Sequence, residues 1–243
     1  MTWRRLDIVM VELGIASTRS QAARLIEDGH VTVDGLLADK AARKIPTGVD
    51  IAVRDAELVG RGGAKLRGAL DAFGISVASK RCIDIGASTG GFTQQLLSGG
   101  ADRVVAVDVG HNQLDQRLLA DIRVENHEGV NARYLRVGEF GERFDVVVAD
   151  LSFISLTLVA QGVTNVASDD ADLALLVKPQ FEVGKDHVGR TGLVTDPDLH
   201  QRAIDAVVAE FNMFGWHLRQ TVESPVVGGD GNQEFFVWLR KKS

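Results

Sequence analysis

The sequence predicts an α/β protein with a Rossmann-like sheet of mostly parallel strands, preceded by a small α+β unit. From residue 82 onward, short apolar runs alternate with stretches of helical periodicity, which is typical of a parallel sheet covered by helices on both faces. A glycine-rich turn follows the first apolar run, where open α/β sheets hold nucleotide-like ligands. Residues 4–54 show a separate pattern of two short helices and a small sheet. The 243 residues are enough for one ordinary α/β domain and a small second one.

Composition and charge limit the classes of protein to which this chain can belong. Its 45% hydrophobic and 25% charged residues are typical of a soluble globular protein, and its apolar runs are too short to cross a membrane. The net charge of −6 argues against non-specific coating of nucleic acid, so any basic surface must be local. The single cysteine, Cys82, excludes an internal disulfide and fits a reducing compartment. We therefore expect a soluble, cytoplasmic protein that does not insert into membranes.

The first unit, residues 1–57, begins with two predicted helices. Apolar residues of 6–13 lie on one helical face, and Ser17 or Thr18 caps a second helix that a glycine ends. The alternating run 31–37 contains an Asp-Gly turn, the strongest short hairpin signal, and a strand at 49–53 closes the unit. Basic and polar side chains of the second helix form one exposed rim, with the N-terminal arginines near it. These candidate contacts to an RNA backbone are Arg4, Arg5, Arg19, Gln21 and Arg24.

Residues 58–64 form a glycine-rich, basic linker, and residues 61–81 carry the clearest basic patch of the chain. Arg61 and Arg67 join the candidate RNA-binding residues for this reason. Apolar spacing predicts a helix from Lys65 onward, which places this lysine near a helix start, against the preference of the helix dipole. Such a local conflict is weak evidence for function.

The predicted sheet lies within residues 65–243. Its strands are expected at 82–85, 104–107, 123–126, 144–149, 173–177 and 234–239, with helices between most of them. The last strand follows a turn-rich segment, and we expect it to pair antiparallel at the edge of the sheet.

A cofactor site is predicted at the turn from Asp84 to Phe92. Its glycines allow a sharp turn and a close approach of the backbone to a ligand, and Asp108, at the end of the next strand, can accept hydrogen bonds from ribose hydroxyls. The charge of Asp84 repels a pyrophosphate and attracts the ammonium and sulfonium of S-adenosylmethionine. A tight turn without a ligand and a dinucleotide site are the alternatives. The full predicted pocket comprises Asp84, Gly86, Ala87, Ser88, Thr89, Gly90, Phe92, Asp108, Val109, Asn131 and Asp150.

Charged residues stand at the ends of three predicted strands, where open α/β sheets build their sites. Asp150 and Lys178 each follow an apolar strand, and Glu234 begins the last strand. A lysine directly after a buried strand needs a carboxylate partner. With Lys65, these residues make two lysines and two acids that can converge beside the methyl donor.

Other features of the chain have ordinary explanations. The six histidines show no metal-ligand spacing, and we expect no metal. Phe92, Phe153 and Phe181 are interpreted as packing residues rather than platforms on which bases stack.

Two resemblances narrow the function. The motifs Arg4-Arg5-Leu6-Asp7, Ser17-Thr18-Arg19-Ser20-Gln21-Ala22 and Val33-Asp34-Gly35 resemble the S4 RNA-binding domain. The whole chain resembles the TlyA family, often called hemolysins, in the segments 61–66, 84–92, 149–155, 176–182 and 231–235. The resemblance implies an FtsJ-like domain that methylates the 2′-oxygen of cytidine in 16S and 23S ribosomal RNA, with S-adenosylmethionine as cofactor and ribosomal subunits as substrate. It also implies a catalytic tetrad of Lys65, Asp150, Lys178 and Glu234.

The residue types fit this chemistry, because a ribose hydroxyl needs a base or strong stabilisation as it loses its proton. We expect Lys178, desolvated and beside Lys65, to have a pKa lowered toward neutrality and to accept that proton. Asp150 would orient Lys178, and Glu234 would position Lys65 or the ribose. The rival functions are a non-catalytic RNA-binding or ribosome-assembly protein, a hemolysin-like membrane-active protein and a dinucleotide oxidoreductase.

Overall fold

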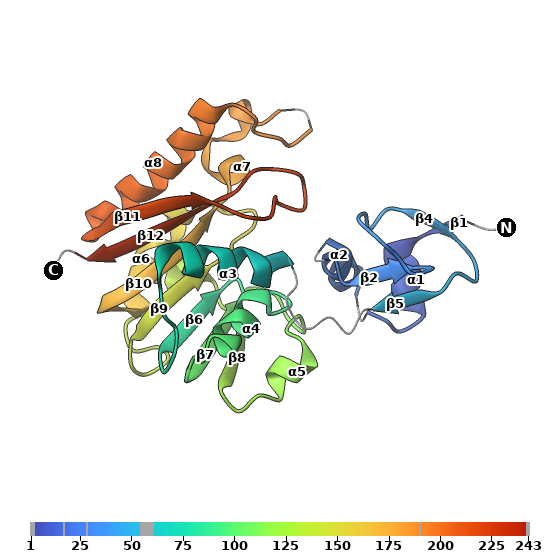
Figure 1. The fold of residues 1–243 in the computed structure, drawn as a ribbon, viewed down its shortest axis with the longest axis horizontal. Helices are drawn as coiled ribbons and strands as arrows, with labels where there is room; N and C mark the ends of the chain where they lie inside the picture. Colours follow the sequence, from blue (N-terminus) through green and yellow to red (C-terminus); the bar gives the residue numbers. More distant parts are fainter. Residues whose placement is uncertain (1–2, 17, 28, 54–60, 190, 242–243) are drawn as a thin grey trace. The chain divides into compact units, whose positions relative to one another are not determined.

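The computed structural model of the 243-residue chain describes residues 3–16, 18–27, 29–53, 61–189 and 191–241 (Figure 1). It divides into two compact units, Met1–Gly62 and Gly63–Ser243. The predicted linker 58–64 has its first three residues outside the described part. Residues 61–64 are helical, because α3 (Arg61–Phe73) begins there.

The smaller unit combines two helices with short strands. Its elements are β1 (Trp3–Arg5), α1 (Leu6–Glu12), α2 (Arg19–Glu27), β2 (Val31–Val33), β3 (Leu36–Leu37), β4 (Lys44–Pro46) and β5 (Ile51–Val53). The predicted helices and hairpin are confirmed, and Asp34 and Gly35 turn the hairpin with φ of 51° and 77°. The pair formed by β1 and β4 is not predicted, since three-residue strands are too short to show an alternating pattern. Apolar residues of both helices and of β2 and β4 form one core: Leu6, Met10, Ala16, Ala22, Ile26, Val31, Val33, Ala38 and Ile45.

The larger unit is built on a seven-stranded sheet in the order β11-β12-β10-β9-β6-β7-β8. The strands are β6 (Arg81–Ile85), β7 (Arg103–Asp108), β8 (Val124–Glu128), β9 (Phe144–Ala149), β10 (Ala167–Val177), β11 (Trp216–Glu223) and β12 (Phe235–Lys241). Between them lie α4 (Gly91–Ser98), α5 (Gln116–Leu119), α6 (Ala160–Val166), α7 (Pro179–Glu182), α8 (Pro197–Met213) and the 3-10 turns η1 (Ala132–Tyr134), η2 (Leu156–Val159) and η3 (Lys185–His187). Strands β6 to β10 pair in parallel, whereas β12 and β11 are antiparallel.

The prediction that the last strand forms the edge is wrong. Strand β12 pairs with β10 on one side and with β11 on the other, so β11 is the edge. Strand β11 is missed because the middle of Trp216–Glu223 is polar and exposed, as an edge strand permits. Strand β10 also begins earlier than predicted, at Ala167, with polar residues and a register shift before Asp172.

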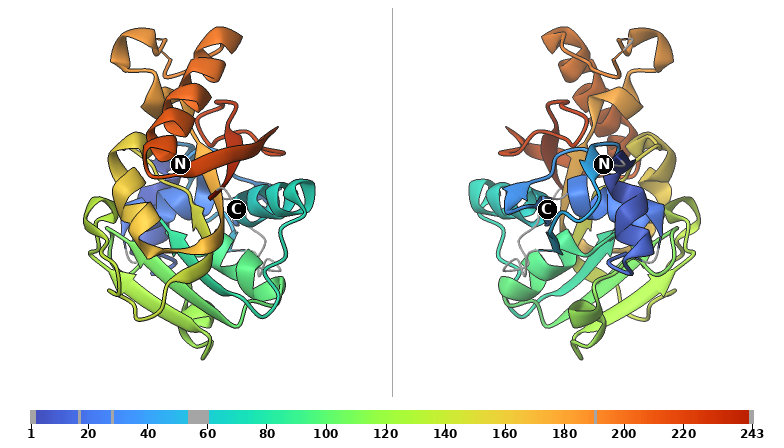
Figure 2. Two further views of the ribbon diagram at one scale, coloured as in Figure 1. Left: turned by 90° about the vertical axis from the view of Figure 1, so that its left-hand side faces the viewer. Right: turned by 90° about the vertical axis from the view of Figure 1, so that its right-hand side faces the viewer.

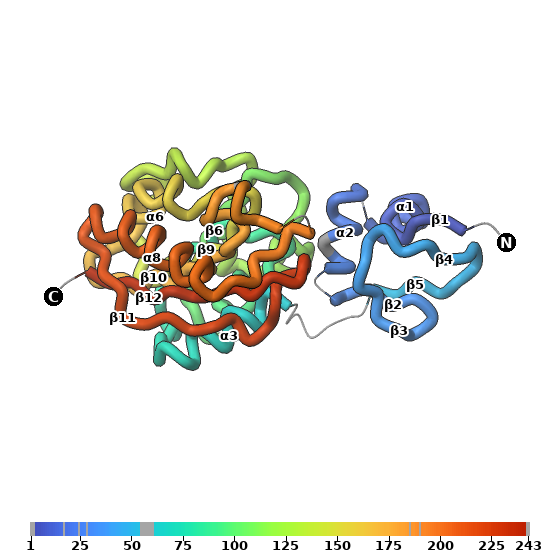
Figure 3. The backbone as a smooth tube through the Cα atoms, turned by 90° about the horizontal axis from the view of Figure 1, so that it is seen from above, coloured from blue at the N-terminus to red at the C-terminus, as the bar shows by residue number. Residues whose placement is uncertain are grey.

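Helices cover both faces of the sheet, as predicted. Successive residues of β9 point to opposite faces, so Val146 and Val148 pack in one core cluster and Val147 and Ala149 in the other. The first cluster includes residues of α3 and α4, and the second includes residues of α6 and α8. Figure 2 shows these helix pairs on opposite sides of the sheet, and Figure 3 shows α3 and α6 on either side of β10 and β12. This arrangement leaves the carboxyl ends of the parallel strands at one edge.

A close approach between β6 and β9 at that edge gives the first prediction. Gly86 has a φ of +87°, and a Cβ there would lie 2.4 Å from the backbone oxygen of Asp150. Gly138 has a similar φ of +78° with nothing within 4 Å, so Gly138→Ala measures backbone strain alone. We expect Gly138→Ala to lower the free energy of unfolding by about 1 kcal/mol and Gly86→Ala to lower it by about 3 kcal/mol.

Urea denaturation in a Trp3→Phe background, followed by the fluorescence of Trp216 and Trp238 in the larger unit, measures the two changes. Equal losses in the two variants would show that the approach to Asp150 imposes no constraint.

Candidate active site

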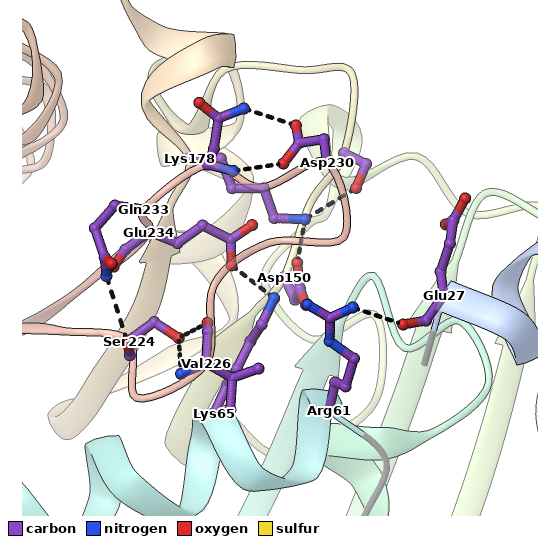
Figure 4. Close-up of polar contacts among 12 residues, drawn as sticks. Glu27, Arg61, Lys65, Asp150, Lys178, Ser224, Val226, Asp230, Gln233 and Glu234 are labelled. Atoms are coloured by element: carbon purple, nitrogen blue, oxygen red, sulfur yellow. Dashed lines mark hydrogen bonds and ion pairs between the residues drawn. The ribbon is translucent and has the colours of Figure 1, made fainter. Parts of the chain in front are cut away.

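Four charged residues meet at the carboxyl edge of the sheet, and we call them the charged tetrad: Lys65, Asp150, Lys178 and Glu234. They form two ion pairs, Lys65 Nζ–Glu234 Oε2 at 2.6 Å and Lys178 Nζ–Asp150 Oδ1 at 2.6 Å (Figure 4). Lys65, Lys178 and Glu234 are only 7%, 8% and 2% exposed. Buried charges are costly unless they are paired, so each lysine depends on its carboxylate. The convergence that the sequence indicates is therefore present in the fold.

Helix α3 brings Lys65 to this edge by packing closely on the segment before β12. A Cβ at Gly68 would lie 2.7 Å from Pro225 Cγ, so a glycine is needed where the helix crosses this segment. Because α3 begins at Arg61, Lys65 is its fifth residue and lies beyond the first turn. The predicted conflict with the helix dipole is therefore wrong, and Glu234 instead offsets the charge of Lys65.

The pKa of Lys178 is raised, which corrects the expectation that it is lowered. Burial acts to lower it, but the charges of Asp150 and Glu234 outweigh that effect. Burial likewise acts to raise the pKa of Asp150, yet Lys178 and Lys65 outweigh it and the pKa lies below its usual value. The lysine is therefore held as an ammonium and the aspartate as a carboxylate.

Ser152 contacts the charged tetrad and Asp230 acts on it electrostatically, and neither was singled out from the sequence. Lys178 Nζ donates to Ser152 Oγ at 2.9 Å, and Gln180 Nε2 donates to Asp230 Oδ2 at 3.0 Å. Asp230 also acts to raise the pKa of Lys178. Their proximity to Asp150, Lys178 and Glu234 along the chain was the only available signal, because a lone serine or aspartate in a loop is common.

The glycine-rich turn surrounds a buried acid. Asp84 is 0% exposed, and Thr93 Oγ1 donates to its Oδ2 at 2.7 Å. Its Oδ1 is buried and accepts no hydrogen bond from any residue that the structure describes. Burial, and to a smaller extent the charges of Asp150 and Asp108, raise the pKa of Asp84 to about 7, although Thr93 acts against them. The carboxylates of Asp84, Asp108 and Asp150 are thus close enough to act on one another at this turn.

The rest of the predicted pocket lies around this turn. The backbone N–H groups of Ser88 and Gly110 donate to the carboxylate of Asp108 at 2.9 and 2.7 Å, which orients it at the end of β7. Val109 beside it is 68% exposed. Asn131 accepts a hydrogen bond from the Arg133 N–H at the start of η1.

The turn itself is tightly packed. The N–H groups of Gly86 and Ala87 donate to the Val107 carbonyl, and the Asp115 N–H donates to the Thr89 carbonyl. Gly90 is the N-cap of α4 and has a φ of +100°. A Cβ at this position would collide with the side chain of Leu118.

The three phenylalanines have different environments. Phe92 is buried against Phe236 with ring centroids 5.9 Å apart, which confirms its packing role and leaves only its backbone to face a ligand. The packing interpretation is wrong for Phe153, which is 90% exposed and adopts a left-handed φ of 66°. Its ring lies 5.5 Å from that of the half-buried Phe181. An exposed aromatic ring next to Ser152 is therefore available to a substrate.

In the smaller unit, the candidate RNA-binding arginines separate into two groups. Arg5 and Arg19 converge on Asp7, a buried carboxylate, with nitrogen–oxygen distances of 2.9 and 3.1 Å. Their bonds, with that of Arg5 the stronger, lower the pKa of Asp7 against the effect of burial. Arg4 pairs instead with Glu12, so it does not share the site of Arg5.

The other candidate RNA-binding residues are Gln21, Arg24, Arg61 and Arg67. The Gln21 N–H donates to Thr18 Oγ1, so Thr18 caps α2. Ser17, the alternative cap, lies outside the described residues. The side chain of Arg24 is also outside them. Arg61 and Arg67 belong to α3, where Arg67 is exposed.

Comparisons with known proteins agree with this division. Residues 58–241 match the FtsJ-like methyltransferase family, and residues 4–51 match the S4 domain. The chain is thus a methyltransferase of the FtsJ-like class with an S4 domain.

Its full-length relatives narrow that class. The chain is 50% identical to the 16S/23S rRNA (cytidine-2'-O)-methyltransferase TlyA of Mycobacterium tuberculosis, over 98% of this chain and 90% of that protein. It is 37% identical to Hemolysin A of Brachyspira hyodysenteriae, over 96% and 98% of the two chains. A solved structure of a hemolysin-named protein from Streptococcus thermophilus has a TM-score of 0.77 and 38% identity, covering 100% of this chain and 90% of that one. The chain belongs to the TlyA family.

Across the described residues, no helix is both long and apolar enough to cross a membrane. Within the same part of the chain, no group of three or more histidine, cysteine or acidic side chains is placed to hold a metal ion.

The raised pKa of Asp84 predicts a particular dependence of stability on pH. An acid whose pKa is about 7 when folded and about 4 when unfolded keeps its proton in the folded state as pH rises, so unfolding releases a proton between these values. The contribution of Asp84 to the free energy of unfolding should therefore fall by a few kcal/mol from pH 4 to pH 7 and level off above it.

Asp84→Asn keeps an acceptor for Thr93 and removes the titration. The difference in unfolding free energy between wild type and Asp84→Asn, measured by urea denaturation from pH 4.5 to 8, should follow this curve. A difference independent of pH would show that Asp84 ionises normally.

Proposed function

We propose that this protein transfers a methyl group from S-adenosylmethionine to the 2′-hydroxyl of a cytidine in ribosomal RNA. The observation that carries the proposal is the charged tetrad, two buried ion pairs at the carboxyl edge of the sheet beside the glycine-rich turn. The relative from Mycobacterium tuberculosis, named for this reaction on 16S and 23S rRNA, supports the choice of nucleoside and RNA. The S4 domain supports an RNA substrate presented within a ribosomal subunit.

The residues around the turn suit S-adenosylmethionine. The buried Oδ1 of Asp84, close to the charges of Asp108 and Asp150, calls for a cationic ligand, whereas the phosphates of a dinucleotide would be repelled. The oriented carboxylate of Asp108 offers acceptors for ribose hydroxyls, and the exposed Val109 offers an apolar surface for adenine. When bound, this cofactor supplies an activated methyl group on a positively charged sulfur.

In the proposed mechanism, Lys178 first releases its own proton to solvent, and the neutral amine then accepts the proton of the 2′-hydroxyl as the methyl group is transferred. Asp150 and Ser152 hold Lys178 Nζ in one orientation. Lys65, oriented by Glu234, places a second positive charge where the oxygen develops negative charge. The exposed ring of Phe153 stacks on the base of the target nucleotide, which aligns its ribose with the tetrad.

The central test is methyl transfer with and without Lys178. Wild type, tritiated S-adenosylmethionine and ribosomal subunits from a strain lacking the endogenous enzyme should yield labelled 2′-O-methylcytidine. Lys178→Ala should lower the rate by at least about 10²-fold with cofactor affinity unchanged, because it removes the proton acceptor. Arg202→Ala, at an exposed basic residue of α8 outside the basic patch 61–81, serves as the control and should keep full activity. Near-normal turnover by Lys178→Ala would refute this role.

The raised pKa of Lys178 predicts how the rate depends on pH. Because a neutral amine must accept the proton, and the ammonium is favoured below the pKa, the fraction of active enzyme grows with pH. At saturating cofactor and RNA, kcat should rise about tenfold per pH unit between pH 7 and 9, and the residual rate of Lys178→Ala should lack this slope. A flat profile for wild type would argue that Lys178 acts only as a fixed positive charge.

The two groups of arginines predict different effects on RNA binding. Arg5→Ala and Arg19→Ala should each weaken binding and reduce the slope of log K against log salt by about one, because each removes one phosphate contact. Arg4→Ala should change both much less, since Glu12 neutralises Arg4 one to one, whereas Arg5 and Arg19 share the single negative charge of Asp7. Titration of ribosomal subunits at several salt concentrations measures both quantities. If Arg4→Ala weakened RNA binding as much as Arg5→Ala, the ion pairs with Asp7 would not determine which arginines contact the RNA.

A further inference from the structure

One half-buried carboxylate, four residues after Lys178, has no part in the proposed chemistry. Glu182 is the last residue of α7, and burial raises its pKa although two hydrogen bonds act against that effect. Those bonds come from the Ser155 hydroxyl and, at 2.8 Å, from the Leu156 N–H. No basic side chain in the described part of the chain forms an ion pair with it. A half-buried carboxylate whose hydrogen bonds come from neutral donors is unfavourable for stability, which points to a functional reason for keeping it.

The two donors belong to the loop that carries the substrate-facing residues. This loop, residues 150–156, begins at Asp150 and ends where η2 starts, so its first residues contact Lys178 and its last contact Glu182. Lys178 directly precedes the four-residue helix α7, and Glu182 is its last residue. The loop and the segment 178–182 are therefore joined twice, once at each end.

Phe153 lies between these two attachments. Its left-handed φ of 66° is unfavourable for a phenylalanine, and its ring, 90% exposed, gains little from packing. Such a conformation persists only when the surrounding residues hold it. Glu182 supplies the attachment on one side, and Ser152 bonded to Lys178 supplies the attachment on the other.

We propose that Glu182 is a positioning residue, which fixes the loop 150–156 so that Ser152 orients Lys178 and Phe153 faces the target nucleotide. The inference rests on the proposed function for its effect on turnover, but its effect on the loop can be measured without RNA. In this role Glu182 contacts neither substrate nor cofactor and acts only through the loop.

The test compares Glu182→Ala with Glu182→Gln. Glu182→Ala removes both acceptors and should lower kcat by about 10- to 100-fold, because small misplacements of reacting groups have effects of this size. Glu182→Gln should restore most of the rate, since its amide oxygen accepts from the Leu156 N–H and its NH₂ group can donate to Ser155 Oγ. Affinities for S-adenosylmethionine and for ribosomal subunits should change little in both variants. Glu142→Ala, at an exposed glutamate before β9, is the matched control.

Amide hydrogen exchange supplies a readout independent of catalysis. Glu182→Ala should speed exchange in peptides covering 151–156 and leave β7 unchanged, while Glu182→Gln should resemble wild type. Ser155→Ala, which removes one of the two contacts and little volume, should show a smaller effect in the same direction. It also tests the attachment if Glu182→Ala folds poorly.

Three outcomes would overturn the inference: unchanged kcat in Glu182→Ala, loop exchange unaffected by that variant, or Glu182→Gln as impaired as Glu182→Ala. A wild type that does not methylate ribosomal RNA would instead refute the proposed function, and faster loop exchange in Glu182→Ala would then still support the attachment.

Discussion

The two ion pairs of the tetrad are the interaction on which the arrangement of the larger unit depends. Lys65 and Glu234 are 169 positions apart in the chain, and they meet because α3 packs on the sheet that contains β12. Removing either partner would leave an uncompensated charge in a site where both side chains are almost fully enclosed, which is strongly unfavourable. The same holds for Lys178 and Asp150, which link the ends of the neighbouring strands β10 and β9. The positions of four elements are thereby tied to the site.

The electrostatics of the site follow from where the strands end. Asp108, Asp84 and Asp150 come from β7, β6 and the end of β9, three strands that are neighbours in the sheet. Two of these acids raise the pKa of the third, Asp84, whose burial is the larger cause. Two lysines beside them are already paired. Negative charge is thus in excess around the glycine-rich turn, whereas the charges of the tetrad balance. Under the proposed function, the first suits a cationic methyl donor and the second suits a hydroxyl that must lose a proton.

Both units orient their positive charges by the same physical means. In the smaller unit, the buried Asp7 holds Arg5 and Arg19, while in the larger unit Asp150 holds Lys178 and Glu234 holds Lys65. Long basic side chains have many rotamers, and a carboxylate that is itself buried reduces that freedom before any ligand arrives. Glu182 holds a loop in a similar way, because its carboxylate accepts hydrogen bonds from the Leu156 N–H and the Ser155 hydroxyl.

The sequence by itself determined the class of fold, the glycine-rich turn and the four residues of the tetrad. Apolar alternation marks buried parallel strands, and a charged residue directly after such a strand must lie at the carboxyl edge of the sheet. Tertiary structure alone decided that β11 is the edge strand, because its polar side chains carry no apolar pattern. It also decided that Phe153 is exposed, since hydrophobicity does not indicate which aromatic residues pack. Tertiary structure also decided the direction in which the pKa of Lys178 shifts. Burial lowers this pKa and nearby carboxylates raise it, and only the distances between the groups determine which effect is larger.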